Sequence, residues 1–452
     1  MKKIAQLLSL ALVLMLAFSL TACGKKSLTI WVGTESQEFY QQMVDDYVEN
    51  YNATHDENFP SEIVVKGVDS GAAAAQFLDD TEAGPDIFTI PHDNLGKLTA
   101  GSSSIAAITN QALIAQMEAD NPQTFLDVSK STVDGTTYYF AVPYVSQSLV
   151  LYYNSSVLTA EDVQTWEGIS AKAIAYSSTV GHEVKAATIL GTDGYNNSFL
   201  LLSEYYNSSN ELTTSVQLYE NGVASACYAT GDDTIAAMKW GRRYFQLTSG
   251  GIDQAGSSGW EEELKDEYSL CLIGGAWNYN AALAALGSNL GIAVLPEFTI
   301  TNADAYGTIA AGTVYQSGTF TDCKCFVMKK GSDYQAYLED ILIYLSSVSV
   351  QEQSFETCAN LPAYKNAADE FAAMSADTLA AKLASCEIEM FNYGIAQPFG
   401  YVQKYNTWFY SKGAPDLIYA MLKNTDNAYP DDASILSCLQ TCETIWKTGA
   451  QN

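Results

Sequence analysis

The chain has 452 residues, of which 48% are hydrophobic, and its 52 acidic residues outnumber its 22 basic residues to give a formal net charge of −30. This length and apolar content suffice for a large buried core and for two or three domains. So strong a negative charge repels phosphate groups, which argues against nucleic acid or an anionic lipid surface as a binding partner.

The N-terminus has the pattern of a bacterial lipoprotein signal. Two lysines form a basic start, residues 4–20 form an apolar stretch too short for a stable membrane span, and small residues precede Cys23. A cysteine at this position supplies the thiol that thioether lipidation requires. We therefore expect residues 1–22 to be a removed signal peptide and Cys23 to carry a lipid anchor, followed by a short tether over residues 23–27. An ordinary secretory signal with an incidental cysteine is the alternative.

Strands and helices alternate in the first part of the mature chain. Strands are expected at residues 28–32, 62–66 and 84–90, and a helix at residues 71–79. Another helix is expected after the first strand, because apolar residues recur there at three- and four-residue steps. These residues are Phe39, Met43, Val44, Tyr47, Val48 and Tyr51. The alternation predicts an α/β domain with a largely parallel sheet.

The middle of the chain continues the α/β pattern, and the last part is mostly helical. Residues 143–147 are expected to join two β-rich runs. Helices are then predicted at 161–169, 197–207, 233–248 and 277–286, and strands at 138–142, 148–153, 172–176, 269–273, 290–294 and within 307–328. From residue 334 onward, apolar helical faces include Leu338, Ile341 and Leu342, and later Leu417, Ile418 and Met421.

Eight cysteines remain besides Cys23. They are Cys227, Cys271, Cys323, Cys325, Cys358, Cys386, Cys438 and Cys442. An even number in an exported chain permits disulfide bonds, but the spacing does not reveal any pairing. The two closely spaced pairs lack the CxxC spacing of a zinc site, and only three histidines are present to complete one. We therefore favour structural cysteines and expect no metal and no other cofactor.

Four groups of short segments resemble the maltodextrin-binding branch of extracellular solute-binding proteins, the ligand-capturing components of ABC importers. They are Leu28-Thr29-Ile30-Trp31-Val32; Gly84-Pro85-Asp86-Ile87-Phe88 followed by His92-Asp93; Val142-Pro143 with Leu151-Tyr152-Tyr153-Asn154 and Trp166-Glu167; and Gly275-Ala276-Trp277 with Val294-Leu295-Pro296. Each segment is a weak signal alone. Their order and spacing behind a lipoprotein signal extend over nearly the whole mature chain.

The resemblance implies a two-lobed α/β fold of the periplasmic-binding-protein type, with hinge strands and a helical C-terminal region. One lobe would comprise residues 28–145 and 299–348, and the other residues 146–298 and 349–452. Open α/β sheets present their strand ends to a crevice. Ligand contacts from both lobes would then favour the closed state.

The resemblance also marks candidate ligand contacts. A sugar offers apolar C–H faces and a rim of hydroxyls, so its site needs aromatic rings and planar polar side chains. The register places Trp277, Trp408 and Phe199 at stacking positions, and Glu35, Asp93 and Gln147 at hydrogen-bonding positions. Each has a structural alternative: the rings as core residues, Asp93 as a helix N-cap, and Glu35 as a favourable charge at a helix start.

Two positions depart from the family pattern. Ile90 stands where the maltodextrin binders carry a stacking tryptophan, and Asn94 replaces a basic residue beside Asp93. A sugar-binding class remains compatible with these changes, but specificity for maltodextrin does not follow.

The expected function is therefore the capture of a sugar, with an oligosaccharide favoured, for import through an ABC permease. The protein would be a monomeric, lipid-anchored receptor on the outer face of the cell membrane, and not an enzyme. The alternatives are an exported carbohydrate-active hydrolase, a binder of a non-sugar polar solute and a structural surface lipoprotein. No GxSxG, HExxH or P-loop motif occurs, although two facing carboxylates would be enough for a glycosidase.

Overall fold

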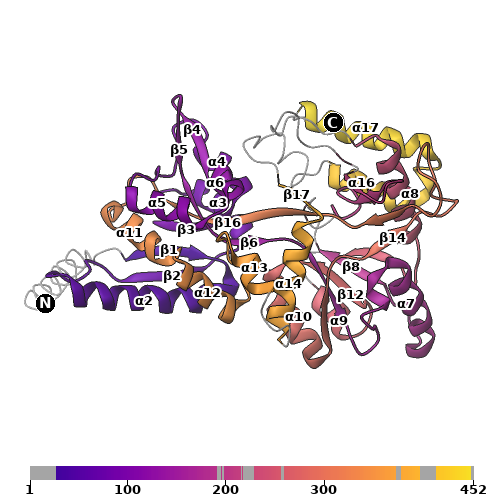
Figure 1. Ribbon diagram of the computed structural model, residues 1–452, viewed down its shortest axis with the longest axis horizontal. Helices are drawn as coiled ribbons and strands as arrows, with labels where there is room; N and C mark the ends of the chain where they lie inside the picture. The colour runs from indigo at the N-terminus through magenta and orange to yellow at the C-terminus, as the bar shows by residue number, and fades with distance from the viewer. Residues whose placement is uncertain are drawn as a thin grey trace, which may run out of the picture.

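The computed structural model describes residues 27–190, 195, 198–214, 216, 229–255, 259–372, 378–397 and 414–448. Two lobes lie side by side along the longest axis of the molecule (Figure 1). We call the lobe that contains the first strand lobe 1, and the other lobe 2. The expected signal peptide, Cys23 and Trp408 lie outside the described residues.

Lobe 1 is built on a mixed sheet whose strands follow the order β2-β1-β3-β16, with β6 also paired to β16. Strands β1, β2 and β3 are parallel because a helix crosses from each strand to the next along the chain. Strand β16 runs antiparallel to both β3 and β6. The elements of lobe 1 are β1 Leu28–Val32, η1 Thr34–Ser36, α2 Gln37–Thr54, β2 Ile63–Gly67, α3 Ser70–Asp79, β3 Ile87–Pro91, η2 His92–Asn94, α4 Leu95–Thr99, α5 Gln111–Asp120, α6 Gln123–Val128, β4 Lys130–Val133, β5 Thr136–Tyr139, β6 Ala141–Gln147, β16 Thr319–Met328, α11 Gln335–Leu345 and α12 Val348–Cys358.

Lobe 2 contains a second mixed sheet of order β11-β8-β12-β7-β13 and a small antiparallel sheet of order β10-β9-β15-β14. Strands β8, β11 and β12 are parallel, whereas β7 runs antiparallel to its neighbours. The elements here are β7 Val150–Asn154, η3 Asp162–Gln164, α7 Trp166–Val180, β8 Ala187–Leu190, β9 Glu204–Tyr206, β10 Leu212–Thr214, α8 Asp232–Phe245, β11 Ile252–Ala255, α9 Trp260–Lys265, β12 Cys271–Gly274, η4 Ala276–Asn278, α10 Tyr279–Leu286, η5 Gly287–Asn289, β13 Leu290–Ala293, β14 Glu297–Thr299, β15 Val314–Gln316, α14 Leu379–Phe391, β17 Gly394–Ala396, α16 Ala414–Lys423, η6 Thr425–Asn427 and α17 Asp432–Thr448. Helix α13, Ala367–Ala372, lies between α12 and α14 in the chain.

Two long strands connect the lobes. Strand β16 begins beside β17, with which it pairs in parallel, and continues into the sheet of lobe 1 (Figure 1). Its partner β6 runs beside it and leads into β7 of lobe 2, and the two strands bring Asp322 opposite Gln147. We call β6 and β16 the hinge strands.

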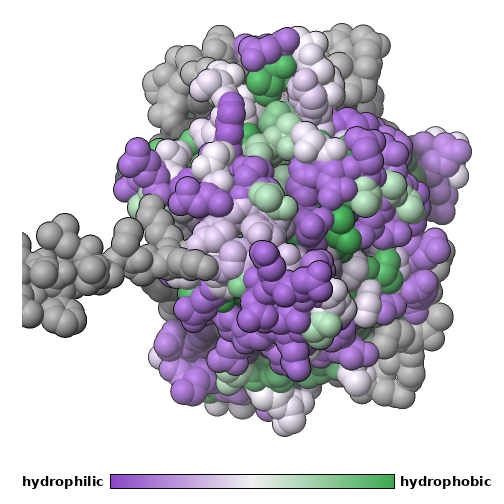
Figure 2. Space-filling view, turned by 90° about the vertical axis from the view of Figure 1, so that its left-hand side faces the viewer, coloured by the Kyte–Doolittle hydropathy of each residue, from purple (hydrophilic) through white to green (hydrophobic). Residues whose placement is uncertain are grey.

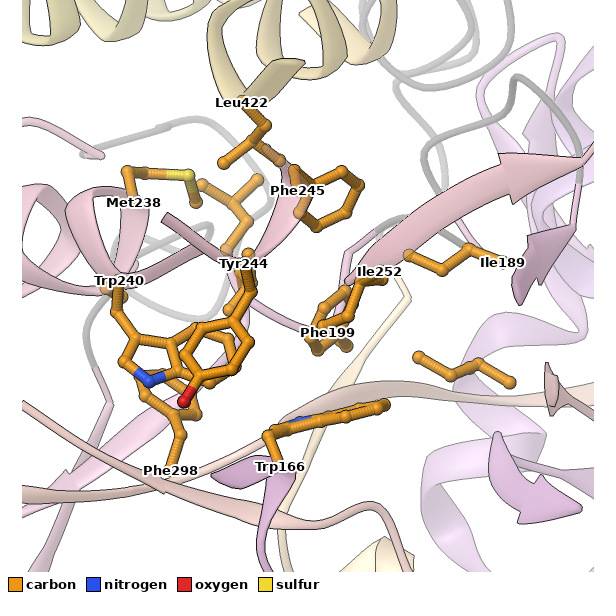
Figure 3. Close-up of a cluster of buried hydrophobic side chains, with 14 of the residues drawn as sticks. Trp166, Ile189, Phe199, Met238, Trp240, Tyr244, Phe245, Ile252, Phe298 and Leu422 are labelled. Atoms are coloured by element: carbon orange, nitrogen blue, oxygen red, sulfur yellow. The ribbon is translucent and has the colours of Figure 1, made fainter. Parts of the chain in front are cut away.

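The core of lobe 2 is rich in aromatic rings (Figure 3). Trp240 packs against Phe298 with ring centroids 4.4 Å apart, and Trp166 lies 5.4 Å from Phe199. The indole nitrogens find partners within the core, since Trp166 donates to the Ser317 hydroxyl at 2.9 Å and Trp240 donates to Glu167 at 2.9 Å. Buried rings with satisfied polar atoms give this lobe a rigid interior.

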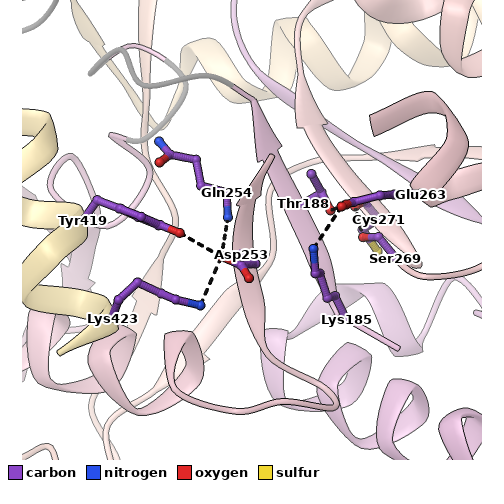
Figure 4. A network of polar contacts seen from close by, with 9 residues as sticks. All are labelled: Lys185, Thr188, Asp253, Gln254, Glu263, Ser269, Cys271, Tyr419 and Lys423. Carbon is purple, nitrogen blue, oxygen red and sulfur yellow. Dashed lines mark hydrogen bonds and ion pairs between the residues drawn. The ribbon is translucent and has the colours of Figure 1, made fainter. Parts of the chain in front are cut away.

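A polar network fastens the C-terminal helices to lobe 2 (Figure 4). Asp253 on β11 accepts hydrogen bonds from the Tyr419 hydroxyl at 2.9 Å and from Lys423 at 3.1 Å, both on α16. Nearby, Glu263 of α9 accepts from Lys185 and Thr188. The expected helical C-terminal region is thus present and packs on lobe 2.

Three sequence-based assignments of local structure are wrong. Residues 143–147 are the second half of buried strand β6, not a linker. Residues 172–176 lie in α7, whose buried residues Trp166, Ile169, Ser170 and Ala173 follow a helical period, and the helix ends only at Gly181 with φ of 79°. Residues 204–206 form β9 rather than the end of a helix.

The hydrophobic clusters divide the chain differently from the expected lobe boundaries at two places. Ile300, Ile309 and Tyr315 pack with the core of lobe 2, although residues 299–318 were expected in lobe 1. Val350 and Cys358 of α12 pack with the core of lobe 1, although they were expected in lobe 2. In both places the chain crosses between the lobes later than expected.

The described surface and cysteines carry few special features. The end face of lobe 1 is mainly hydrophilic (Figure 2), as expected for so acidic a chain.

Among the described helices, none has the length and apolar character needed to cross a membrane. The seven described cysteines are all buried free thiols, and no group of potential metal ligands is found in the described ranges, while Cys227 lies outside them.

Candidate functional site

A cavity of about 190 Å³ lies where the two lobes face each other. We call it the cleft cavity. Its wall contains polar residues from lobe 1 and the hinge strands together with an aromatic ring of lobe 2. The residues that matter most for its chemistry are Glu35, Asp69, Gln147, Trp277, Asp322 and Lys324.

The strand topology explains why these side chains meet. Glu35 follows the carboxyl end of β1, Asp69 follows that of β2, and Trp277 follows that of β12. Carboxyl ends of parallel strands open on the crevice at the edge of an α/β sheet. Gln147 and Asp322 come from the hinge strands, which run past the same crevice. The strand ends of both sheets therefore lie at the same crevice, which contains the cleft cavity.

Trp277 is held by the turn that precedes it. The hydroxyl of Tyr152 donates a hydrogen bond to the Gly275 carbonyl at 2.9 Å, which fixes this turn against the sheet of lobe 2. Gly275 is needed because any side chain there would overlap the Trp277 ring. The indole is only partly buried and lies 6.0 Å from the ring of Tyr195, another residue of the cavity wall. The ring thus remains open to an occupant.

Lys324 and Glu35 form an ion pair at 2.9 Å inside the cavity, with only 9% and 16% of their side chains exposed. Burial alone would raise the pKa of Glu35, but the Lys324 ammonium and the hydrogen bonds to this carboxylate outweigh burial and lower it. Burial likewise works against the Lys324 charge, yet Glu35 holds its pKa above the usual value. The ammonium also lies 5.8 Å from the centroid of the Trp277 ring, a cation–π distance that links the lobes.

Asp322 and Gln147 present buried hydrogen-bond acceptors to the cavity. They are 2% and 5% exposed, and within the described structure Oδ1 of Asp322 and Oε1 of Gln147 have no hydrogen-bond partner. Burial raises the pKa of Asp322 to about 8, and the nearby Asp93 adds to this rise, whereas hydrogen bonding of the Asp322 carboxyl with the side chains of Gln147 and Tyr195 and the charge of Lys324 oppose it. Buried acceptors without donors cost free energy, so their presence in a cavity wall indicates a place for a donor-bearing ligand.

Apart from Trp408, which lies outside the described residues, the predicted site residues divide into three groups. Glu35, Gln147 and Trp277 line the cleft cavity, and their role as ligand contacts stays a prediction. Asp93 lies buried behind the wall, where it accepts a hydrogen bond from Asn94 at 3.1 Å and acts on Asp322 electrostatically. Phe199 was expected at a stacking position, but it is 1% exposed in the core of lobe 2, so this expectation is corrected (Figure 3).

Sequence reasoning missed the two charged residues of β16. Asp322 and Lys324 alternate with Cys323 and Cys325 in a strand that is almost entirely buried. A period of two places both charged side chains on one face. Two charges on one face of an apolar strand were a signal for a polar site that could have been used.

A second cavity, of about 310 Å³, lies on the other side of the hinge strands. Ser146 lines it while Gln147 lines the cleft cavity, because neighbouring residues of a strand point to opposite faces. Its wall is mainly apolar and includes Phe125 of lobe 1 and Phe391 of lobe 2. We call it the rear cavity. His92 on its wall is buried, which lowers its pKa to about 4 and leaves the ring neutral.

Comparison with known proteins assigns the class. Residues 46–382 match the family described as bacterial extracellular solute-binding protein, and the chain belongs to this family. No curated protein matches the chain significantly.

Solved structures of similar fold extend over almost the whole chain. A maltodextrin-binding protein, MalE1 from L. casei, superposes with a TM-score of 0.65 at 18% identity, covering 93% of this chain and 99% of its own. The maltose-binding protein MalE of Listeria monocytogenes, in complex with maltose, has a TM-score of 0.63 at 16% identity and coverages of 95% and 100%. MalX from Streptococcus pneumoniae, in complex with maltopentaose, gives 0.65 at 16% identity, with 94% and 100% covered. These likenesses establish the two-lobed fold.

Proposed function

We propose that this protein is the carbohydrate-capturing receptor of an ABC importer and that it binds its sugar in the cleft cavity. The single observation that carries the proposal is an accessible Trp277 ring facing buried polar groups of the other lobe. Aromatic rings pack on the C–H faces of sugars, and polar side chains bind the hydroxyl rim. The bound sugars of the similar structures, maltose and maltopentaose, support this choice of ligand class.

Ligand contacts from both lobes would close the cleft. Glu35 and Lys324 belong to the lobe 1 side, whereas Trp277 belongs to lobe 2. A ligand that touches all three gains contacts only when the lobes approach, so binding favours the closed state. The captured sugar would then be delivered unchanged to a membrane permease by a monomeric receptor.

A lipid anchor at Cys23 would keep the receptor beside that permease. Only four residues, 24–27, separate this cysteine from strand β1. Incorporation of a labelled fatty acid in the bacterial cell should be lost in Cys23→Ala, and the variant should move from the membrane fraction to the medium or periplasm. Labelling that survives in the variant would contradict an anchor at this residue.

A thermal-shift screen tests the proposed ligand class. The purified mature protein is heated with a panel of oligosaccharides, amino acids and polyamines, because a ligand that binds only the folded state raises the melting temperature. We expect the largest shifts from sugars. Shifts from a non-sugar solute alone would reassign the ligand class.

A glycosidase is the second candidate, and one observation favours it. Two carboxyl groups with pKa values moved in opposite directions, Glu35 lowered and Asp322 raised, line one cavity. Glycosidases use such a pair as base or nucleophile and as acid. Chromatography after prolonged incubation with the bound oligosaccharide separates the two functions. A receptor returns the sugar intact, whereas shortened products would establish hydrolysis.

A further inference from the structure

The buried hydrogen-bond acceptors in the wall of the cleft cavity need hydrogen-bond donors. Oδ1 of Asp322 and Oε1 of Gln147 are buried, lack partners in the described ranges and lie opposite each other on the hinge strands. An ammonium group carries three donors and no acceptor. Its hydrogen bonds to a carboxylate are about twice as strong as neutral ones. One hydroxyl group can donate only one hydrogen bond, whereas one ammonium group can donate to both acceptors. The Asp322–Gln147 pair therefore suits an ammonium better.

The charges of the wall favour a cation as well. Three carboxyl groups, those of Glu35, Asp69 and Asp322, line the cavity, and Lys324 is its single cationic side chain among the described residues. The Glu35–Lys324 pair is internally neutral. Asp93, buried behind the wall, adds negative potential at Asp322. The charge left uncompensated is therefore negative: it lies on Asp69 and, once an ammonium displaces its proton, on Asp322.

The aromatic wall already accommodates an ammonium group. Lys324 places its own ammonium 5.8 Å from the centroid of the Trp277 ring. An indole face attracts cations through its quadrupole while it also packs on the C–H face of a sugar. A ligand that has both a sugar skeleton and a positive charge would use both of these properties of the indole ring.

We propose that the sugar captured in the cleft carries a protonated amine, whose ammonium group binds between Asp322 and Gln147. This inference rests on the proposed function and narrows its ligand class to amino sugars.

Binding would be coupled to proton release. With a pKa raised to about 8, the Asp322 carboxyl carries a proton at neutral pH when the cavity is empty. An arriving ammonium lowers that pKa, so the proton leaves to solvent and a carboxylate–ammonium pair remains. The groups that face Asp322 are Gln147 on β6, Asp93 on η2, Lys324 on β16, Tyr195, and Glu387 on α14. A neutral sugar at the same place would release no proton.

The test uses disaccharides that share one skeleton and differ only at carbon 2. Chitobiose carries amines, N,N′-diacetylchitobiose carries acetamides, and cellobiose carries hydroxyls; the corresponding monosaccharides are titrated alongside. Calorimetry at pH 7 should show the amine bound at least tenfold more tightly than its counterparts. Its affinity should fall at higher salt concentration. Titrations in two buffers of different ionisation enthalpy should show proton release for the amine only.

Two charge-neutralising variants locate the amine. Asp322→Asn keeps the shape of the side chain, and it should reduce amine affinity at least tenfold while weakening the neutral sugars much less. Asp127→Asn makes the same substitution on α6, outside the cavity wall, where the Asp127 side chain is 54% exposed. It should leave both affinities unchanged. Melting curves check that both variants are folded.

The outcomes separate this inference from the proposed function. Equal or tighter binding of neutral sugars, equal weakening of all ligands by Asp322→Asn, or binding of neutral sugars with none of the amines would overturn the amine assignment and leave the receptor function standing. Failure of every sugar, in these titrations and in the thermal-shift panel, would overturn both.

Discussion

Aromatic rings occupy two contrasting regions of lobe 2. In the core, Trp166 and Trp240 touch other rings and their indole nitrogens are hydrogen-bonded inside the lobe. In the cleft, Trp277 meets the Lys324 ammonium from the other side of the crevice, and the wall around it retains acceptors without donors. The comparison teaches that the surroundings of a ring decide its role. A fully buried ring whose indole nitrogen is hydrogen-bonded stabilises the fold, whereas a partly exposed ring beside a buried ion pair is available to a ligand.

The largest effect is expected in the core. Phe199→Ala should lower the free energy of unfolding by about 3–5 kcal/mol, the usual cost of removing a buried phenyl ring. Chemical denaturation followed by circular dichroism measures this loss, and Phe199→Leu should lose much less. Ligand affinity per folded molecule should not change. A large loss of ligand affinity with little loss of stability would show that Phe199 contributes to ligand binding after all.

Breaking the ion pair between Glu35 and Lys324 in the cleft should have the next largest effect. Lys324→Met leaves Glu35 charged in a mostly buried place, so we expect about 3 kcal/mol of lost stability. The double variant Glu35→Gln/Lys324→Met removes both charges and should recover most of that loss in the same denaturation experiment. If the double variant is as unstable as the single one, the pair is not what makes the lysine important.

Removing the cleft ring should affect binding more than folding. Trp277→Ala is expected to weaken sugar binding by about 1–3 kcal/mol, the scale of losing one large aromatic contact. Isothermal titration calorimetry measures it, and Trp277→Phe should keep part of the affinity. Unchanged affinity in the alanine variant would remove this residue from the site.

The smallest effect concerns the dependence of stability on pH. Asp322 holds its proton up to a pKa of about 8 in the folded protein, well above the value of an unfolded aspartate. At this group the folded state therefore binds more protons than the unfolded state between these values, so the contribution of Asp322 to stability falls as pH rises from about 4 to 8. Buried His92 contributes the opposite sign between about pH 4 and pH 6.5, because its pKa is lowered in the folded protein. Asp322→Asn should remove at least about 1 kcal/mol of that fall, equivalent to one pKa unit.

Glu387 gives the same sign, because burial raises its pKa as well, so a slope should remain in the Asp322 variant. Melting temperatures at pH 5 and pH 8 provide the measurement, with Asp127→Asn as the control. A variant whose slope equals that of the wild type would show that Asp322 is not the group that titrates.

Much of the fold could be predicted from local patterns. Strand β1, helix α2 and helix α8 carry apolar periods that survive in the structure because one face of each is buried. The errors fall where local signals are ambiguous. Lys172 to Tyr176 reads as a short β-rich run, yet it continues the helix that buries Trp166 and Ala173. Packing against the core decided its structure, and that is invisible in a five-residue window.

Part of the candidate site was predictable, namely residues that follow strand ends and Gln147 of β6, whereas the charged residues of β16 were not predicted. Glu35 and Trp277 lie just beyond β1 and β12, at positions that a strand pattern and a family resemblance can mark. Asp322 and Lys324 reach the cleft only because β16, far along the chain, pairs with β3 and β6. Phe199 follows β8 in the chain but turns inward to meet Trp166. Long-range strand pairing and the direction of a side chain are tertiary facts that a single sequence does not specify.

Small-angle X-ray scattering of the mature protein, with and without a saturating sugar from the thermal-shift panel, tests the central claim most directly. If the cleft cavity captures the sugar between the lobes, the radius of gyration should fall on binding in the wild type, and Trp277→Ala should need a higher sugar concentration to show the same fall. A radius of gyration that stays constant while calorimetry shows the sugar bound would contradict capture between the lobes.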